Sequence, residues 1–328
     1  MRRAAARIAL CLLALAAAGG PAHAFDFGRS GDAPIAIDAN RGVEWRREER
    51  VFIARGNARA ERGDVTVNGD VLTAHYRRTD KGETRVHRLE AEGDVVVRSE
   101  RATAFGDSGV YDVDKGVMVL HGKKLRLETP DQVVTARDSL EYWEKREMAV
   151  ARGDARMESD RGTLTGDVLT ARFRENDAGK RVIRRVDAFG DAVSKGPDGT
   201  VRGDHLVAHM TDGPNGRRTD RMDARGHVVV KTNGNIARGE RGAYDPQKRM
   251  ATLAGNVRVT QGESQLNGAY AVINMKTGVS RLYPVPPGEA GDRAGEKAPR
   301  VRGLLAPRDD RDAGKAPDAS RTGGGDDE

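Results

Sequence analysis

A 26-residue segment of this sequence occurs twice, and the duplication constrains the fold more than any single residue does. Residues 69–94, which begin GDVLTA, return 97 residues later as 166–191, with 13 of 26 positions identical and no gap. A repeat unit of this kind buries its apolar face only by stacking on its neighbours. The sequence therefore predicts a stack built from copies at about 39–135, 136–232 and 233–282.

Within each copy, apolar residues alternate with polar ones. Leu89, Ala91, Val95 and Val97 fall at every second position, with charged residues between most of them. A period of two is typical of a strand with one buried and one solvated face. We therefore predict an all-β chain of roughly twenty strands, arranged as about ten strands per sheet and roughly 50 Å long.

The middle positions of the inward stripe are small, as in Ala91 with Gly93 and Ala188 with Gly190. We expect these glycines to lie on the inner face and keep it shallow. One interpretation is a filled sandwich, in which small residues let two sheets approach closely. The other interpretation is a continuous apolar trough across the strands. Aromatic residues make up only 4% of the chain, so few large side chains are available to fill such a trough.

Both ends of the chain differ in character from the repeats. Residues 1–24 have a basic start, an apolar centre and an Ala22-His23-Ala24 cleavage pattern, which predict a cleaved secretory signal peptide. We expect a flexible N-terminus over 25–34, a repeat domain over 35–283, and a disordered polar tail over 284–328.

Composition excludes several classes of function. The only cysteine, Cys11, lies in the predicted signal peptide, so we expect neither disulfides nor thiol chemistry. The net charge of +6 is spread along the chain without long basic runs. Nucleic-acid binding needs clustered basic residues with aromatic platforms, so we expect no nucleic-acid partner.

No combination of residues predicts catalysis, a metal site or a cofactor. His205 and His209 are four residues apart, but on a strand that spacing is roughly 13 Å, too long for one zinc ion. Residues 112–116 are better explained as a hairpin turn than as a calcium loop. The aspartates after repeated glycines (Asp70, Asp107, Asp167 and Asp204) are best explained as turn or bulge residues. We therefore predict a non-enzymatic protein without cofactor or metal.

Two linked motifs recur in register: A-x-G-[ND]-[VA]-x-[VMA], then G-D-x-L-x-A-x-[YFM]. They occupy 54–58 with 69–76 and 151–155 with 166–173, and further copies lie at 188–192 with 203–210 and at 224–228 with 239–244. Over roughly residues 35–283, this pattern resembles the OstA-like domain of lipopolysaccharide-transport proteins. The resemblance implies an antiparallel, jelly-roll-like "β-taco" of stacked V-shaped strands.

The resemblance also implies a function. We expect a periplasmic lipopolysaccharide carrier or bridge that shields acyl chains in a hydrophobic groove between the inner and outer membranes. Implied partners are the lipid A acyl chains, LptC-like and LptD-like proteins bound through strand edges, and further copies joined head to tail.

Two other readings stay open: a structural β-repeat scaffold of the cell envelope with a filled core, and a β-helical carbohydrate-active enzyme. The unequal glycine spacing, 29–37 residues, argues against the enzyme. The residues expected to line the groove are Leu72, Ala74, Tyr76, Leu89, Val95, Val97, Leu169, Ala171, Phe173, Val186, Leu206, Met210, Met222, Val228, Val230, Leu253 and Val257.

Overall fold

The computed structural model describes residues 35–285, with short gaps at 81, 177–178, 180, 198, 214–215, 233–234, 275 and 278, and residues 300–304. The segments predicted to be a signal peptide and a flexible N-terminus lie outside the described residues, as does most of the predicted disordered tail. Within that tail, however, Arg302–Leu304 form a short strand that pairs with the stack.

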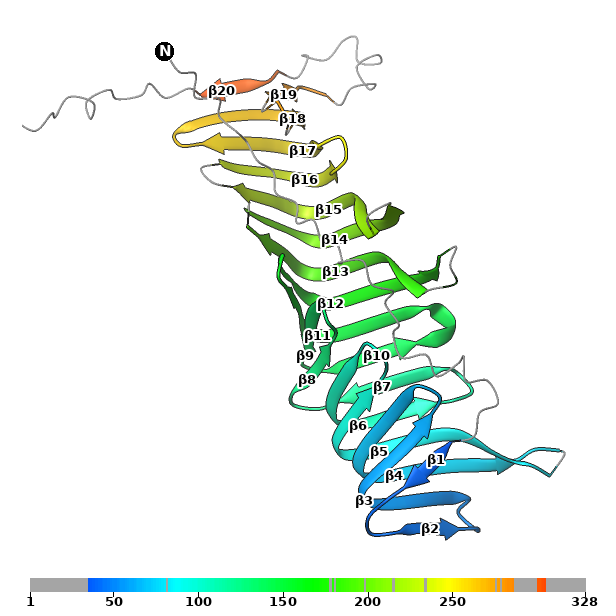
Figure 1. Ribbon diagram of the computed structural model, residues 1–328. Coiled ribbons are helices and arrows are strands. Elements are labelled where there is room, and N and C mark those ends of the chain that lie inside the picture. Colours follow the sequence, from blue (N-terminus) through cyan, green and yellow to red (C-terminus); the bar gives the residue numbers. More distant parts are fainter. Residues whose placement is uncertain are drawn as a thin grey trace, which may run out of the picture.

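The chain is a single antiparallel sheet of 20 strands (Figure 1). The first ten are β1 (Ala36–Asp38), β2 (Val43–Arg46), β3 (Val51–Arg62), β4 (Val65–Arg78), β5 (Thr84–Arg98), β6 (Thr103–Asp112), β7 (Val117–His121), β8 (Leu125–Glu128), β9 (Gln132–Ala136) and β10 (Ser139–Trp143). The others are β11 (Met148–Ser159), β12 (Gly162–Glu175), β13 (Arg181–Gly196), β14 (Gly199–Gly213), β15 (Gly216–Thr232), β16 (Asn235–Asp245), β17 (Met250–Gln261), β18 (Ser264–Asn274), β19 (Val279–Tyr283) and β20 (Arg302–Leu304). A 3-10 turn, η1 (Glu144–Arg146), joins β10 to β11.

Four levels of the stack are each made by two short strands: β1 with β2, β7 with β8, β9 with β10, and β19 with β20. The 20 strands therefore form 16 levels, and at about 4.8 Å per level the stack is roughly 70 Å long. The prediction of about ten strands per sheet and roughly 50 Å was wrong. Each long strand bends and contributes to both halves of the sheet, so the strands are not divided between two sheets.

The bend lies at the repeated glycine motif. In β5, Gly93 (φ +75°) and Asp94 (φ +42°) are both left-handed, and the register of pairing shifts between Glu92 and Val95. Two such residues form a bulge that turns the strand sharply. The same pair occurs in six strands, at 56–57, 93–94, 153–154, 190–191, 226–227 and 255–256. We call this line of bulges the corner.

The expectation that Gly93 and Gly190 lie on the inner face was wrong. A Cβ atom on Gly93 would lie 2.3 Å from Oδ2 of Asp70, and one on Gly190 would lie 2.0 Å from Oδ2 of Asp167. Asp70 is exposed on the outside of the corner. These glycines are therefore required by positive φ and by a close carboxylate. They do not line the interior.

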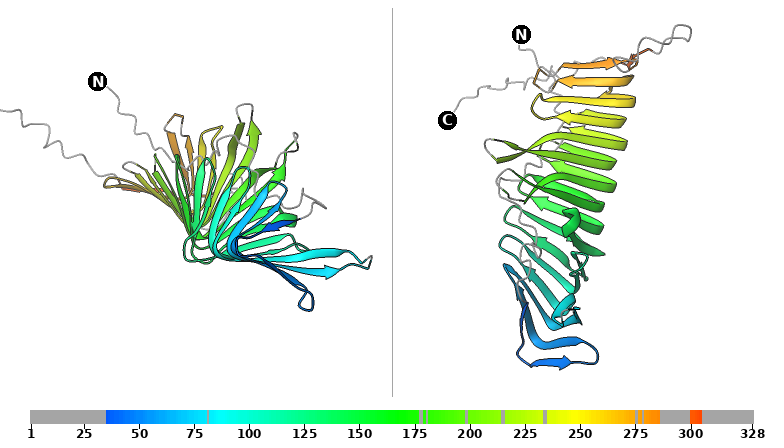
Figure 2. Two further views of the ribbon diagram at one scale, coloured as in Figure 1. Left: turned by 60° about the horizontal axis from the view of Figure 1, so that its bottom comes forward. Right: turned by 90° about the vertical axis from the view of Figure 1, so that its right-hand side faces the viewer.

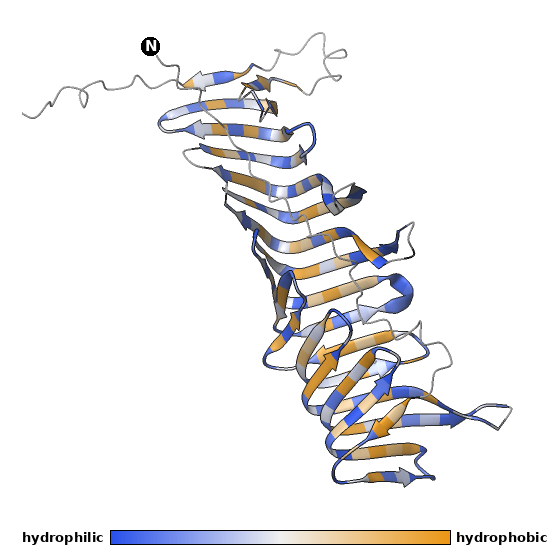
Figure 3. Ribbon diagram, in the orientation of Figure 1, coloured by the Kyte–Doolittle hydropathy of each residue, from blue (hydrophilic) through white to orange (hydrophobic). Residues whose placement is uncertain are grey.

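The corner divides the sheet into two walls, which diverge from it in the left-hand view of Figure 2. We call the half that contains β2, β7 and β10 the first wall, and the half that contains β1, β8 and β9 the second wall. Buried apolar side chains of both walls form one cluster, and most polar side chains point away from it. The alternation along each strand is visible as orange and blue bands (Figure 3). In the part of the chain that the structure describes, no helix is long and apolar enough to cross a membrane.

Candidate functional site

The inner face of the first wall carries one residue per strand in unbroken register from β2 to β19. Leucine alternates with alanine or glycine along most of this row, so a large side chain is flanked by small ones on neighbouring strands. In order, the row is Val43, Ala54, Leu72, Ala91, Gly109, Leu120, Leu140, Ala151, Leu169, Ala188, Leu206, Ala224, Gly242, Leu253, Ala271 and Leu282.

The neighbouring inner row, farther from the corner, contains the large aromatic side chains. Its large members include Phe52, Tyr111, Met118, Tyr142 and Met222, and alanines such as Ala74 and Ala171 lie between them. Because the walls diverge with distance from the corner, the space between them widens there and can hold an aromatic ring.

The structure places the predicted groove residues together in this interior. Val95, Val97, Val228, Val230 and Val257 belong to the second wall, and the others to the first wall. All of them except Ala171 are buried, with at most 8% of each side chain exposed, and Ala171 is partly buried against the same cluster.

Sequence reasoning missed part of the interior. Leu120, Leu125, Leu140 and Tyr142 are buried, with 7% or less exposed, and belong to the same cluster. They lie on the short strands β7, β8 and β10, where interruption at the corner leaves alternating runs too brief to stand out. Residues 43–45 (Val-Glu-Trp) and 140–142 (Leu-Glu-Tyr) are similar and 97 residues apart, and this similarity could have identified Leu140 and Tyr142 as interior residues.

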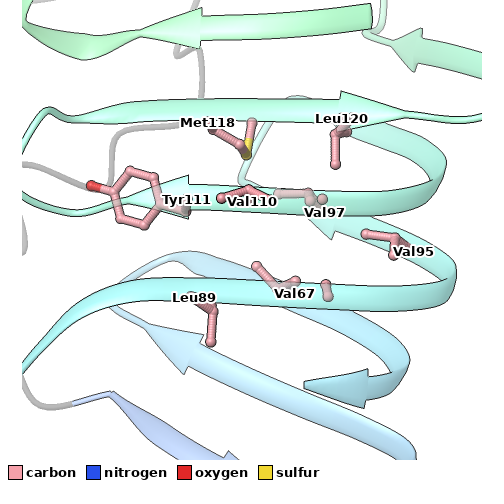
Figure 4. Close-up of a pocket in the computed structure, with 10 residues that line it drawn as sticks. Val67, Leu89, Val95, Val97, Val110, Tyr111, Met118 and Leu120 are labelled. Carbon is pink, nitrogen blue, oxygen red and sulfur yellow. The ribbon is translucent and has the colours of Figure 1, made fainter. Parts of the chain in front are cut away.

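The interior is closed by its own side chains. A small cavity of about 20 Å³ lies between the walls, lined from the second wall by Val67, Val95 and Val97 and from the first wall by residues including Leu89 and Met118 (Figure 4). This is room for about one water molecule. The inner side chains of the described strands are otherwise mostly buried in one cluster, so an apolar guest needs the walls to move apart.

Tyr111 and the two histidines of the i, i+4 pair have close polar partners. Tyr111 also lines the cavity, where burial and the nearby Glu144 carboxylate raise the pKa of the Tyr111 phenol. On the outer face, His205 Nε2 lies 2.8 Å from Oδ1 of Asp187, which is 2% exposed, and His209 lies 3.3 Å from Asp223. The two histidines thus have separate partners. The described residues contain no cluster of three or more His, Cys, Asp or Glu side chains that could hold a metal ion.

The first wall ends in an uncovered part of the same inner face. Trp45 is 52% exposed although it continues the row of Phe52. Its indole nitrogen donates a hydrogen bond of 2.8 Å to the hydroxyl of Tyr76, and its ring stacks on Phe52 with centroids 5.4 Å apart. The apolar interior therefore continues to the N-terminal end of the stack, where no described strand covers it.

These features define a class: an all-β repeat protein of V-shaped strands with an apolar interior running the length of the stack. The family model for the LptA/(LptD N-terminal domain) LPS transport protein matches residues 36–138 and again 137–279. The chain belongs to this family. The two matches meet at the corner interruption between β9 and β10, and together they cover most of the stack.

Two individual proteins are also similar to the chain. The uncharacterized protein R00383 of Rhizobium meliloti (strain 1021) is 28% identical over 102 residues, which is 30% of this chain and 54% of that protein. The chain thus spans about half the length of this relative. Among solved structures, the chain is similar to LptH from Pseudomonas aeruginosa, the LptA homologous periplasmic component of the conserved lipopolysaccharide transport device. The two sequences are 18% identical, and the match covers 54% of this chain and 95% of LptH with a TM-score of 0.24.

Proposed function

We propose that the chain is a non-enzymatic periplasmic carrier of lipopolysaccharide, which shields the acyl chains between its two walls. The observation that carries this proposal is the apolar inner row, which is unbroken over every level from β2 to β19 in a chain of this family. An acyl chain in water costs about 0.8 kcal/mol per methylene group, so a lipid with several chains needs such cover to cross an aqueous space.

Loading requires the walls to part, because the interior is closed. Acyl chains would then replace the contacts that the two walls make with each other, so apolar burial is retained when the walls open. The hydrophobic effect is non-directional, and side chains such as Leu72 and Leu169 would hold any saturated chain without recognising its head group. This fits a carrier better than a receptor.

Photocrosslinking tests the proposal directly. A photoreactive residue at Leu72 or Leu169, on the inner face, should crosslink lipid A when the purified protein is incubated with lipopolysaccharide. The matched controls are Thr73 and Thr170, which are adjacent on the same strands and face outward. Equal yields at inner and outer positions would refute a ligand between the walls.

The second candidate is a structural scaffold with a permanently filled core, and the closed interior is the observation that favours it. Spin labels at Arg78 and Arg98 distinguish the two functions, because these exposed residues end β4 in the first wall and β5 in the second. A carrier should show a longer distance between the labels when lipopolysaccharide is added. If the distance between the labels is unchanged and no lipid binds in the interior, the scaffold is supported.

We also propose that LptC-like and LptD-like proteins, or further copies of this chain, pair with the end strands. Among the residues that the structure describes, the exposed large apolar side chains are concentrated at the two ends: Val43 and Trp45 at β2, and Val279, Val301 and Leu304 at β19 and β20. Uncovered strand edges are templates for pairing with another chain. Pairing of unlike ends gives an open filament and not a closed dimer.

Sedimentation velocity at increasing concentration tests this. The variant Trp45→Asp should reduce end-to-end association, whereas Phe189→Asp, which changes an apolar side chain 40% exposed in the middle of the stack, should not. Association that is insensitive to Trp45 but sensitive to Phe189 would contradict pairing through the ends.

A further inference from the structure

The outer face of the second wall carries a row of arginines in continuous register. One residue from each level from β3 to β20 contributes, and arginine alternates with smaller or β-branched residues along most of the row. In order, the row is Arg59, Asn68, Val96, Phe105, Arg126, Thr135, Arg156, Thr165, Val193, Arg202, Val229, Arg238, Arg258, Asn267 and Arg302.

In the first half of the stack, the arginines of this row are neutralised on their own strands. Arg59 forms an ion pair with Glu61 at 2.8 Å, two residues further along β3. Arg126 pairs with Glu128 on β8 in the same way, and Arg156 pairs with Glu158 on β11. Arg98 lies in the row of the glutamates, and its charge is balanced by that of Asp38, which is opposite Arg59 on β1. The two outer rows of the second wall are therefore close to electrically balanced from β1 to β11.

The second half lacks these glutamates. Lysines Lys195 and Lys231 occupy the row that holds Glu61, Glu128 and Glu158 in the first half. Arg202 reaches Asp191 at 3.2 Å, but none of the described acidic residues forms an ion pair with Lys195, Lys231, Arg238 or Arg258. We call the following set the basic stripe: Lys195, Arg202, Lys231, Arg238, Arg258 and Arg302.

The corner acid Asp191 pairs with Arg202 of the basic stripe, and two further acids close to the corner have partners outside the stripe. Asp204 accepts a hydrogen bond of 3.0 Å from His227, and Glu240 accepts one from Asn256. From β13 to β20, the exposed residues of the two rows are the six basic residues of the stripe and Leu304. The other positions are half-buried valine, threonine, isoleucine, asparagine and glutamine. One ion pair, Arg202 with Asp191, is formed for six basic residues, so the second half presents a line of excess positive charge.

The chemistry of the stripe favours a lipid surface over a protein partner. Binding sites for proteins are usually centred on aromatic anchors with arginine, and lysine is depleted there. The stripe contains two lysines, and its two rows carry no aromatic side chain between β13 and β20. The basic residues of the stripe are spread along one face, on alternate strands about 10 Å apart or, for Arg238 and Arg258, on adjacent strands, and this arrangement instead suits a layer of anionic head groups.

We propose that the basic stripe docks the C-terminal half of the stack side-on against an anionic lipid head-group surface. This contact uses the outside of the second wall, so it is independent of any ligand between the walls and of pairing through the strand ends. Each basic residue near such a surface strengthens binding about fivefold, the equivalent of about 1 kcal/mol.

Vesicle sedimentation with the purified chain tests the proposal. Wild-type protein should bind vesicles of phosphatidylglycerol and phosphatidylethanolamine, and should not bind vesicles of phosphatidylcholine alone. Binding should weaken strongly between about 0.1 M and 1 M salt, where the Debye length falls from about 10 Å to about 3 Å. The double variant Arg238→Gln/Arg258→Gln should bind the anionic vesicles roughly 25-fold more weakly.

The matched control is Arg126→Gln/Arg156→Gln, which removes the same total charge from the same row in the balanced half. It should change vesicle binding no more than twofold. Equal losses in the two variants would mean that only net charge matters, and would overturn the proposal. It is also overturned if anionic vesicles are not bound, including the case in which the stripe instead captures an acidic protein. Crosslinking of lipid A at Leu72 should be unchanged in both variants, so failure here leaves the carrier function intact.

Discussion

The β1–β2 and β9–β10 segments are related by the 97-residue repeat but have opposite surroundings. Val43 and Trp45 are 49% and 52% exposed, whereas their counterparts Leu140 and Tyr142 are 7% and 3% exposed. The difference comes from β7, which covers β10, and β8, which covers β9, while the only described strand next to β1 and β2 is β3. A level made of two short strands can therefore have a neighbouring level on each side, as β9 and β10 do, whereas β1 and β2 have a described neighbour on one side only.

Truncating the buried member of this pair should have the largest effect. Leu140→Ala removes a leucine packed between Leu120 and Ala151, and should lower the free energy of unfolding by about 2 to 5 kcal/mol. Val43→Ala, at the equivalent open position, should cost less than about 1 kcal/mol. Urea unfolding midpoints measure both. Equal losses would show that the two segments have the same surroundings in solution.

The corner should respond equally in both copies. Gly93→Ala and Gly190→Ala each force a side chain onto a residue with φ above +70° and into an aspartate, and each should destabilise by about 1 to 3 kcal/mol. Adding Asp70→Ala to Gly93→Ala should recover part of the loss by removing the steric conflict. Thermal unfolding is the measurement. A large difference in the loss of stability between the two glycine variants would mean that the two copies differ at the corner as well as in the exposure of their first strands.

Glu44 and Glu141 occupy equivalent positions and should differ in their effect on acid stability. Burial acts to raise the pKa of Glu141, whose side chain is 10% exposed. Hydrogen bonds from Arg152, Trp143 and Ser139 outweigh burial and hold this pKa below its ordinary value. A carboxylate with a depressed pKa stabilises the fold above its unfolded pKa of about 4.3, and this contribution is lost as the pH falls through the folded pKa.

Replacing Glu141 by Gln should therefore lower stability at pH 7 by about 1 to 2 kcal/mol and reduce the loss of stability on acidification. Glu44 is half exposed, and a hydrogen bond from Arg46 lowers its pKa. Because solvent screens that pair, Glu44→Gln should leave the acid profile almost unchanged. Unfolding curves at pH 7 and at about pH 4 compare the two variants. A steeper acid loss in Glu141→Gln would contradict this account.

The alternation of residues such as Leu89, Ala91, Val95 and Val97 predicted the strands and their buried side chains, because period two depends only on the pleat of the backbone. The repeat motif predicted V-shaped strands through family resemblance. The place of Gly93 could not be predicted from alternation, since two consecutive left-handed residues form a bulge that turns the strand and interrupts the alternation there. The number of levels was underestimated for the same reason.

The state of the interior and the basic stripe could not be found along the sequence. Whether Val67 meets Leu89 across the interior depends on how far the walls diverge, and the pattern of either strand alone does not contain that distance. Arg202, Arg238 and Arg258 are unremarkable in their own segments. They become neighbours only through the register of strands that are up to 36 residues apart.

The alternation of leucine with alanine or glycine along the inner row has a consequence for motion. In the proposed carrier, an apolar guest displaced by two levels, about 10 Å, would meet similar surroundings along most of the row. The alternation is broken where Ala91 meets Gly109, Leu120 meets Leu140 and Ala224 meets Gly242. Between these points the energy of the guest would vary little along the axis. Because symmetric diffusion has no preferred direction, net movement would then be set by where guests are supplied and where they are removed.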